Sequence, residues 1–274
     1  MKKIILSILV CFIVPVLYAQ ENPRIYHILD SDSSEVSFSD MIVAASKADI
    51  ILFGELHTNP VAHWLEYKML EALPSEGLTL GMEQFETDVQ EVVDEYLSGL
   101  ISRRSFESEA RVWPNYNNDY SALVEYAREN KIPLLATNIP RRYAASVGRG
   151  GCCVLDSFPE TARKFMPPLP FVYKPGSRDG ELSSMMSAMG GGRRYMLEAQ
   201  GLKDASMAWQ ISRVSGKVIH INGRAHSDGG EGIVKYLEEY CPGRSVMIVS
   251  VMTSDEDLDC SVADFVIVVS QDFH

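Results

Sequence analysis

Residues 49–73 read DIILFGELHTNPVAHWLEYKMLEAL, and this stretch decides the fold. The run from Asp49 to Phe53 is short, apolar and rich in isoleucine, as expected of a buried strand. From Pro60 to Leu73 the apolar residues recur at helical spacing. The sequence therefore predicts a strand followed by a helix, with the polar segment Gly54-Glu55-Leu56-His57 between them.

The same alternation continues along the chain. Further strands are predicted at 78–82, 132–136, 217–221, 246–251 and 265–269, and further helices at 88–97, 120–129 and 231–240. Strands that alternate with helices form mainly parallel sheets, because the connections cross over right-handedly. We therefore predict the α/β class, with a mainly parallel central sheet flanked by helices.

The pattern changes between Arg141 and Ser215. Three breaks interrupt it: Gly148–Gly151, Pro167–Pro170 and Gly190–Gly192. The longest helix predicted there spans 193–213. We interpret residues 141–215 as a mostly helical cap inserted into a single domain of residues 20–274, with 22–39 as an N-terminal arm.

The first nineteen residues are typical of a secretory signal peptide: Lys2 and Lys3, an apolar run from Ile4 to Val16, and a small residue at Ala19. A membrane anchor is the alternative, but the run is shorter than the roughly 20 residues that span a bilayer. Cys11 lies inside the apolar run, which argues against a lipid anchor. We expect a soluble periplasmic protein with no transmembrane segment after the signal is removed.

Charge and cysteine content narrow the possible partners. The net charge is −12, and losing Lys2 and Lys3 with the signal makes it −14, which disfavours nucleic acid as a partner. An oxidising compartment permits disulfides. Three pairings of Cys152, Cys153, Cys241 and Cys260 are possible, and adjacent Cys152 and Cys153 form a strained pair.

Polar residues follow four of the predicted strands, where parallel sheets bind ligands. These are Gly54-Glu55-Leu56-His57, Glu83-Gln84, the segment 137–142, and 222–226, which ends in Gly223-Arg224-Ala225-His226. The GxxH pattern thus occurs twice, each time after a strand. In the plainest interpretation, the glutamates Glu55 and Glu83 cap helices and the histidines bond to loop carbonyls.

The same four residues, Glu55, His57, Glu83 and His226, also suit chemistry. Two histidines and carboxylates can hold a divalent metal ion, or can form an acid/base pair that activates water. The sequence contains no nucleophile elbow, phosphate-binding glycine loop or HExxH helix. Serine hydrolases, nucleotide-binding proteins and zincins are therefore disfavoured.

The order of seven motifs, spanning about residues 48–269, resembles the ChaN-like haem-binding uptake family. The motifs are ILFGELHTNPVAH, LGMEQFE, WPNYNNDYSALVEYAR, ATNIPRR, AQGLKDASMAW, INGRAHSDGGEGI and ADFVIVV. The family belongs to a wider group with two GxxH motifs and an early glutamate. That group includes erythromycin-esterase-like and Tiki/TraB-like members, some of them metal-dependent proteases, and its signature falls on Glu55, His57, Glu83 and His226.

The resemblance implies an iron-acquisition protein that binds haem, in at least one member as a homodimer with paired haems, and that works with an outer-membrane haem receptor system. Tyr173 and Tyr195 are the candidate tyrosine ligands of haem iron, and half-buried packing is the alternative role for each. Candidate partners of the haem propionates are Arg141, Arg142 and Arg224. The cap is also rich in methionine, at Met185, Met186, Met189, Met196 and Met207.

Two functions follow. The first is an exported haem carrier in haem and iron uptake. The second is an esterase or peptidase, either metal-dependent or using Glu55 and His57 on a bound water. The strand-end residues favour a polar site, whereas haem requires a large apolar surface, which the cap is expected to supply.

Overall fold

The computed structural model describes residues 24–177, 179–180, 184 and 195–270. These residues form an eight-stranded sheet in the order β2-β1-β8-β7-β3-β6-β4-β5. The strands are β1 (Tyr26–Asp30), β2 (Glu35–Val36), β3 (Ile50–Glu55), β4 (Leu78–Glu86), β5 (Leu134–Asn138), β6 (Lys217–Gly223), β7 (Val246–Thr253) and β8 (Phe265–Val269). All neighbours from β8 to β5 are parallel, while β1 and β2 run antiparallel at one edge. The predicted α/β class and mainly parallel sheet are confirmed.

Strand β3 lies in the middle of the sheet, and all its residues are buried. Because side chains alternate along a strand, Ile51 and Phe53 enter the core on one face and Ile50 and Leu52 enter the core on the other. A strand buried on both faces must be apolar throughout, which is why 49–53 carries such a strong strand signal.

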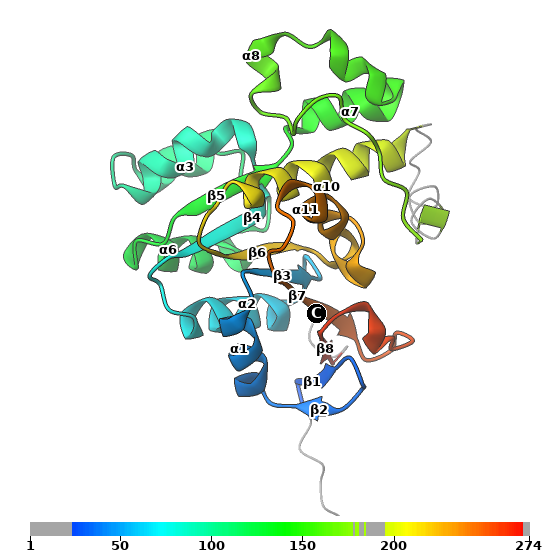
Figure 1. The fold of residues 1–274 in the computed structure, drawn as a ribbon. Helices are drawn as coiled ribbons and strands as arrows, with labels where there is room; N and C mark the ends of the chain where they lie inside the picture. The colour runs from blue at the N-terminus through cyan, green and yellow to red at the C-terminus, as the bar shows by residue number, and fades with distance from the viewer. Residues whose placement is uncertain (1–23, 178, 181–183, 185–194, 271–274) are drawn as a thin grey trace, which may run out of the picture.

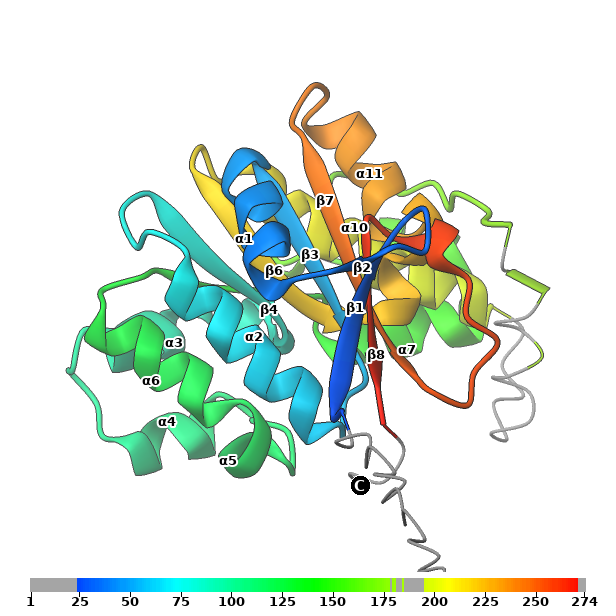
Figure 2. The same cartoon turned by 90° about the horizontal axis from the view of Figure 1, so that it is seen from below.

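Helices cover both faces of the sheet (Figures 1 and 2). One face carries α1 (Phe38–Lys47), α2 (Pro60–Ala72) and α6 (Ser121–Glu129), joined by α3 (Gln90–Leu97), α4 (Arg103–Glu109) and α5 (Tyr116–Asp119). The other face carries α7 (Arg141–Gly150), α10 (Met196–Ser212) and α11 (Ile233–Tyr240). The connections include α8 (Glu160–Arg163) and the short helices η1 (Thr87–Val89), η2 (Cys152–Ser157), η3 (Arg224–His226), η4 (Asp228–Gly230) and η5 (Cys260–Val262).

Helix α10 is the longest described part of the predicted cap. It packs against α7, α11 and β5, and Met207 is fully buried in the core that these elements share. Met185, Met186 and Met189 lie outside the described residues. The division into a single domain with a cap over about 141–215 stays a prediction.

In the N-terminal arm the sequence also predicts a short strand at 24–28, and β1 (Tyr26–Asp30) overlaps it. The predicted arm holds β1, β2 and the start of α1, whose N-cap Ser37 forms a capping box with Asp40. Predicted signal residues 1–19 lie outside the described part of the chain. Among the described helices, none combines the length and apolar composition that crossing a membrane requires.

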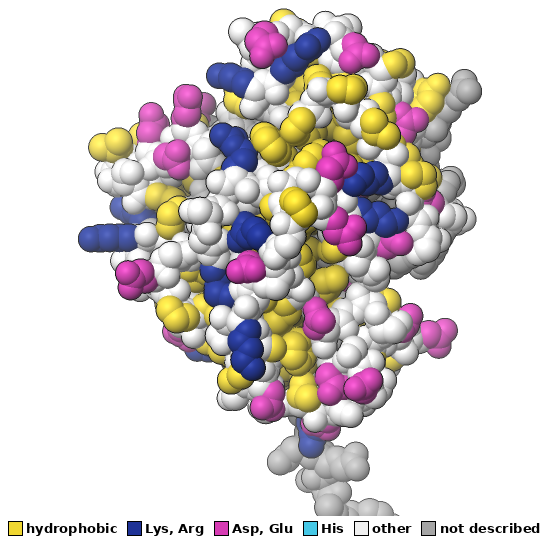
Figure 3. Space-filling model, viewed as in Figure 1, with side chains coloured by type: hydrophobic (Ala, Val, Ile, Leu, Met, Phe, Trp, Pro, Cys, Tyr) yellow, Lys and Arg dark blue, Asp and Glu magenta, His cyan; other side chains and the backbone are white. Residues whose placement is uncertain are grey.

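The described surface carries charges of both signs (Figure 3), and the four described cysteines form no disulfide with one another. Figure 3 shows Lys and Arg interspersed with Asp and Glu on one face, with apolar side chains between them. Cys152, Cys153, Cys241 and Cys260 are all free thiols.

Candidate functional site

A cleft of about 850 Å³ opens at the carboxyl ends of β4, β5 and β6. Its polar lining includes His57, Glu83, Gln84, Asn138, Gln200 and His226. Its apolar lining comes from Val112, Trp113, Pro114, Ile139, Ala144, Ala145, Met196 and Ala199, and Arg111, Arg141 and Lys203 add positive charge. The cleft thus lies where the sequence predicted a crevice, with α7 and α10 forming one wall.

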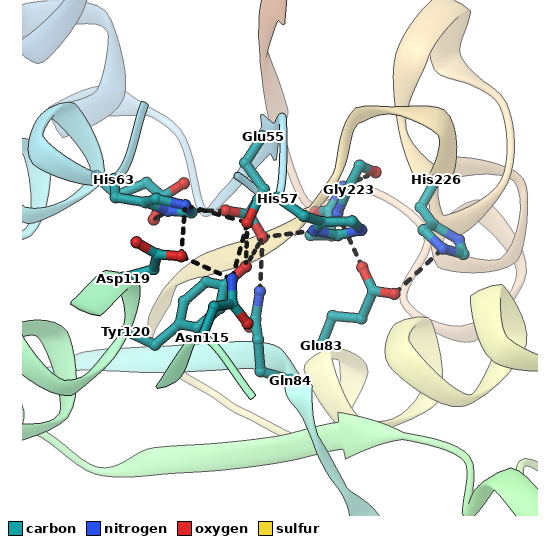
Figure 4. Close-up of polar contacts among 12 residues, drawn as sticks. Glu55, His57, His63, Glu83, Gln84, Asn115, Asp119, Tyr120, Gly223 and His226 are labelled. Atoms are coloured by element: carbon teal, nitrogen blue, oxygen red, sulfur yellow. Dashed lines mark hydrogen bonds and ion pairs between the residues drawn. The ribbon is translucent and has the colours of Figure 1, made fainter. Parts of the chain in front are cut away.

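Glu55, the last residue of β3, is 1 % exposed. Its Oε1 accepts hydrogen bonds from Gln84 Nε2 (2.7 Å), Tyr120 OH (2.9 Å) and His57 Nδ1 (2.8 Å), as Figure 4 shows. Burial by itself raises the pKa of this carboxyl group, but hydrogen bonds from His57 and His63 outweigh burial and lower the pKa to about 2. Glu55 is therefore a carboxylate at neutral pH, and it orients the ring of His57.

His57 stands over Gly223, the glycine of the second GxxH motif. A Cβ atom at Gly223 would lie 2.8 Å from both Cε1 and Nε2 of His57. The imidazole meets Trp113 edge-on, with ring centroids 5.1 Å apart, and 42 % of its side chain is exposed. Burial opposes charging, yet the bond to Glu55 and the charge of Glu83 raise the pKa of His57.

The two motifs depend on each other because β3 and β6 are neighbours. Glu55 is paired in register with Gly223. The first motif thus contributes the histidine, and the second contributes the glycine that leaves space for it.

His226, in η3, is held between two carboxylates. Its Nδ1 donates to Asp204 Oδ1 (2.5 Å), and its Nε2 lies 3.3 Å from Glu83 Oε1. Burial lowers the pKa of His226, but the charges of Glu83 and Asp204 outweigh burial and raise it to about 10. At neutral pH His226 is an imidazolium, so a metal ion could bind it only by displacing a proton.

Glu83 lies between the two histidines in Figure 4. Its Oε2 accepts from Gly223 N at 2.8 Å, and its Oε1 faces His226. Burial raises the pKa of Glu83, but the charge of His226 and the hydrogen bonds lower it well below the usual value. Neither Glu55 nor Glu83 caps a helix; Asn59 caps α2.

A second polar cluster lies behind Glu55, against α2. His63 Nδ1 is 3.0 Å from Glu55 Oε2 and 3.4 Å from Glu66 Oε2. Burial opposes charge on His63, but hydrogen bonds to both glutamates raise its pKa to about 10. Burial and the charge of Glu55 raise the pKa of Glu66 to about 8. Of the four predicted metal ligands, only Glu55 belongs to this cluster.

The residues predicted to bind a metal ion are not the residues that lie close enough together to hold one. Among the described residues, Glu55, His63 and Glu66 present one ligand atom each within 4.8 Å of one another, and His57, Glu83 and His226 form no such group. The structure therefore brings Glu55, His57, Glu83 and His226 together as neighbours around the cleft, but not as one closely spaced ligand set.

The predicted arginines separate into different settings. Arg141 lines the cleft and donates to Glu86 Oε1 at 2.6 Å. Arg142 lies next to it and pairs with Asp88, outside the lining. Arg224 is also absent from the lining; it pairs with Asp228 and Glu256.

Neither predicted tyrosine ligand lines the cleft. The hydroxyl of Tyr173 donates to Asp179 (2.7 Å), and its ring packs on Gly201 of α10, where a Cβ would lie 2.5 Å from the ring. Tyr195 is the N-cap residue of α10, and its ring lies close to Gly151. Their assignment as ligands stays a prediction.

A family model described as "Haem-binding uptake, Tiki superfamily, ChaN" matches residues 41–237. The chain belongs to this family. A solved structure of ChaN from Campylobacter jejuni, described as showing cofacial haem binding, is similar with a TM-score of 0.72 and 20% identity, covering 89% of this chain and 96% of that one. A Bacillus cereus structure is similar with a TM-score of 0.52 and 11% identity, covering 86% and 92% of the two chains. The search of curated proteins gives no match.

Sequence reasoning missed four polar residues at or beside this site of the ChaN-family chain. They are His63, Glu66, Asp204 and Arg111. A signal was present for Glu66, since it falls on the apolar stripe of α2 with Ala62, Met69 and Leu70, where a charged residue needs a buried partner. Asp204 gave a weaker signal of the same kind, because it is a charged residue among the buried residues of α10. Arg111 had none, because its loop position is set by ion pairs with Glu86 and Asp88.

Proposed function

We propose that this chain is an exported, periplasmic haem-binding protein that takes part in haem and iron uptake. The observation that carries the proposal is the family match over residues 41–237. It is supported by a cleft whose volume of about 850 Å³ falls within the range of small-molecule sites and whose lining combines apolar side chains with polar and charged ones.

The lining residues fit a porphyrin. Trp113, Ile139, Ala144 and Met196 provide an apolar surface, and Trp113 offers an aromatic face or edge to a planar ligand. Arg141 stands on the wall with its side chain 70 % exposed. Its Nε donates to the buried Glu86, and its terminal nitrogens can bond a propionate. In this arrangement the haem lies in the cleft, with its propionates at the arginine side.

Titration with haemin tests the proposal, with absorbance in the Soret region as the readout. The mature protein is expected to give a saturable Soret shift. Arg141→Ala is expected to weaken haemin binding several-fold, because an exposed ion pair contributes up to about 1 kcal/mol. Arg142→Ala is the matched control, since Arg142 adjoins Arg141 but does not line the cleft. The absence of a saturable shift in the wild type would refute the proposal.

The iron ligand is tested in the same assay. His57 lines the cleft, so His57→Ala is expected to change the Soret spectrum if haem iron binds there. Tyr173→Phe and Tyr195→Phe test the two tyrosines, which lie outside the lining; a changed spectrum in either would place the haem elsewhere. His226 is disfavoured because both of its ring nitrogens face carboxylates.

Export and assembly belong to the same proposal. The full-length chain is expected in the periplasmic fraction, shortened by residues 1–19, which intact-mass measurement detects. The Campylobacter jejuni neighbour is described as binding haem cofacially. We propose that this chain forms a homodimer with paired haems, which light scattering with and without haemin tests, and that it acts beside an outer-membrane haem receptor.

A hydrolase is the second candidate, and one observation favours it. Glu55 orients His57 at the cleft wall, while Glu83 stands beside Gly223, so a carboxylate–imidazole pair faces space where a substrate could bind. The raised pKa of His57 means that its basic form increases as the pH rises through that pKa. Ester or peptide hydrolysis is therefore expected to increase with pH and to be lost in His57→Gln; an inactive wild type across a substrate screen would remove this candidate.

A further inference from the structure

A buried polar cluster lies on the side of the sheet that α2 and α6 cover, separate from the residues that line the cleft. It consists of Glu55 at the end of β3 and of His63 and Glu66, which are one turn apart on α2. The two glutamate side chains are 0 % exposed and the histidine side chain is 6 % exposed. We propose that these three residues bind a divalent transition-metal cation of the Zn²⁺ type.

The spacing of the donor atoms fits such a cation. Glu55 Oε2 and Glu66 Oε2 lie 3.0 Å and 3.4 Å from His63 Nδ1, and one ligand atom from each residue falls within 4.8 Å of the others. Around Zn²⁺, with bonds to nitrogen and oxygen of about 2.0–2.2 Å, adjacent tetrahedral ligand atoms are about 3.3–3.6 Å apart. The three residues would supply three of the four ligands of such an ion.

Two oxygens of the cluster, Glu55 Oε2 and Glu66 Oε1, are buried without a hydrogen-bond partner among the described residues. With its pKa raised to about 8, Glu66 is a protonated carboxyl group at neutral pH. A cation at the centre of the cluster would displace this proton and the proton on His63 Nδ1, and would satisfy the oxygens directly or by bidentate binding. These orphaned oxygens are an observation independent of the spacing.

Neighbouring residues hold the three candidate ligands in place through polar contacts, as the residues around a bound metal ion do. His63 Nε2 lies 3.3 Å from the carbonyl oxygen of His57, which leaves Nδ1 facing the glutamates. The second oxygen of Glu55 is fixed by Gln84 and Tyr120. Asp119, 3.8 Å from His63 Nε2 and 19 % exposed, places an acidic group on the outer side of the cluster, where a cation would approach.

The donor set also selects the kind of cation. An imidazole beside two carboxylates suits Zn²⁺, whereas Ca²⁺ and Mg²⁺ take oxygen ligands. Because Glu55 also holds His57 Nδ1, an ion in this site would fix the position of the histidine that borders the cleft.

The experiment uses the wild-type protein, stripped with a chelator and titrated with ZnCl₂. Calorimetry and elemental analysis after dialysis are expected to give one Zn²⁺ per chain. X-ray absorption of that complex is expected to show nitrogen and oxygen ligands with a single imidazole. Two imidazoles would place the ion at His57 and His226 and overturn the proposal, as would the absence of stoichiometric Zn²⁺.

Two matched variants locate the ion. Glu66→Gln is expected to weaken Zn²⁺ binding by about tenfold or more, in line with the loss of a ligand. Glu83→Gln changes an equally buried glutamate in the cleft and is expected to leave the affinity within about twofold. The reverse pattern would refute the site. Circular dichroism checks folding, and if Glu66→Gln does not fold, the imidazole count in the wild type decides.

Discussion

His220 in β6 gives the protein a specific sensitivity to acid. The imidazole is fully buried; it contacts Thr137 Oγ1 at 2.8 Å and Asn222 Oδ1 at 3.0 Å. Burial lowers the pKa of His220 to about 4, although the bond to Asn222 and the charge of Glu83 act in the opposite direction. Native His220 is therefore neutral over most of the acid range.

The sign of the effect follows from the two pKa values. Below pH 6.5 the imidazole of the unfolded chain gains a proton, whereas the native one stays neutral until the pH approaches about 4. The unfolded state thus binds more protons between these values, and stability falls as the pH decreases through this interval. At 1.36 kcal/mol per pH unit, the loss is about 3 kcal/mol over the whole interval and about 2 kcal/mol between pH 7 and pH 5.

Urea unfolding of the wild type and of His220→Gln at pH 7, 6 and 5 measures this contribution. Glutamine keeps hydrogen-bonding capacity at the site but does not titrate. We expect the free energy of unfolding of the wild type to fall by about 2 kcal/mol more than that of the variant between pH 7 and pH 5. Parallel pH dependences in the two proteins would refute the reasoning.

Three further substitutions test the site and its supports. Gly223→Ala is expected to push the His57 ring away from Glu55 and so to lower the pKa of His57 towards its ordinary value, as measured by NMR titration. The control is Gly180→Ala, whose added Cβ has no atom within 4 Å and is expected to leave the pKa of His57 unchanged. Asn59→Ala removes the N-cap of α2 and is expected to cost about 1 kcal/mol in urea unfolding; an unchanged midpoint would contradict the capping role. Tyr120→Phe removes the hydroxyl bond to the buried carboxylate and is expected to destabilise by about 1.5–3 kcal/mol, so a neutral result would show that this bond contributes nothing.

Much of the fold could be predicted because its signals are local. Strand 265–269 is predicted with the limits that β8 has, and 217–221 lies within β6. Strand β4 runs to Glu86, beyond the predicted end at 82, and Glu86 still pairs with Asn138 of β5. Three of its last four residues are polar, although all four are buried. A polar residue inside a strand gives no local signal of its burial.

The sequence by itself determined that polar residues follow the strands of a parallel sheet. Side-chain periodicity and glycine positions depend only on residues that are close together in the sequence. Only the tertiary structure decided which of those residues meet. The order of strands places β6 between β3 and β4, so Gly223 stands beside Glu55, His57 fits over it, and Glu83 reaches His226. The packing of α2 on the sheet likewise buries His63 and Glu66 against Glu55. These contacts join residues on separate elements, and the free energy of burying charged groups depends on partners that periodicity does not specify.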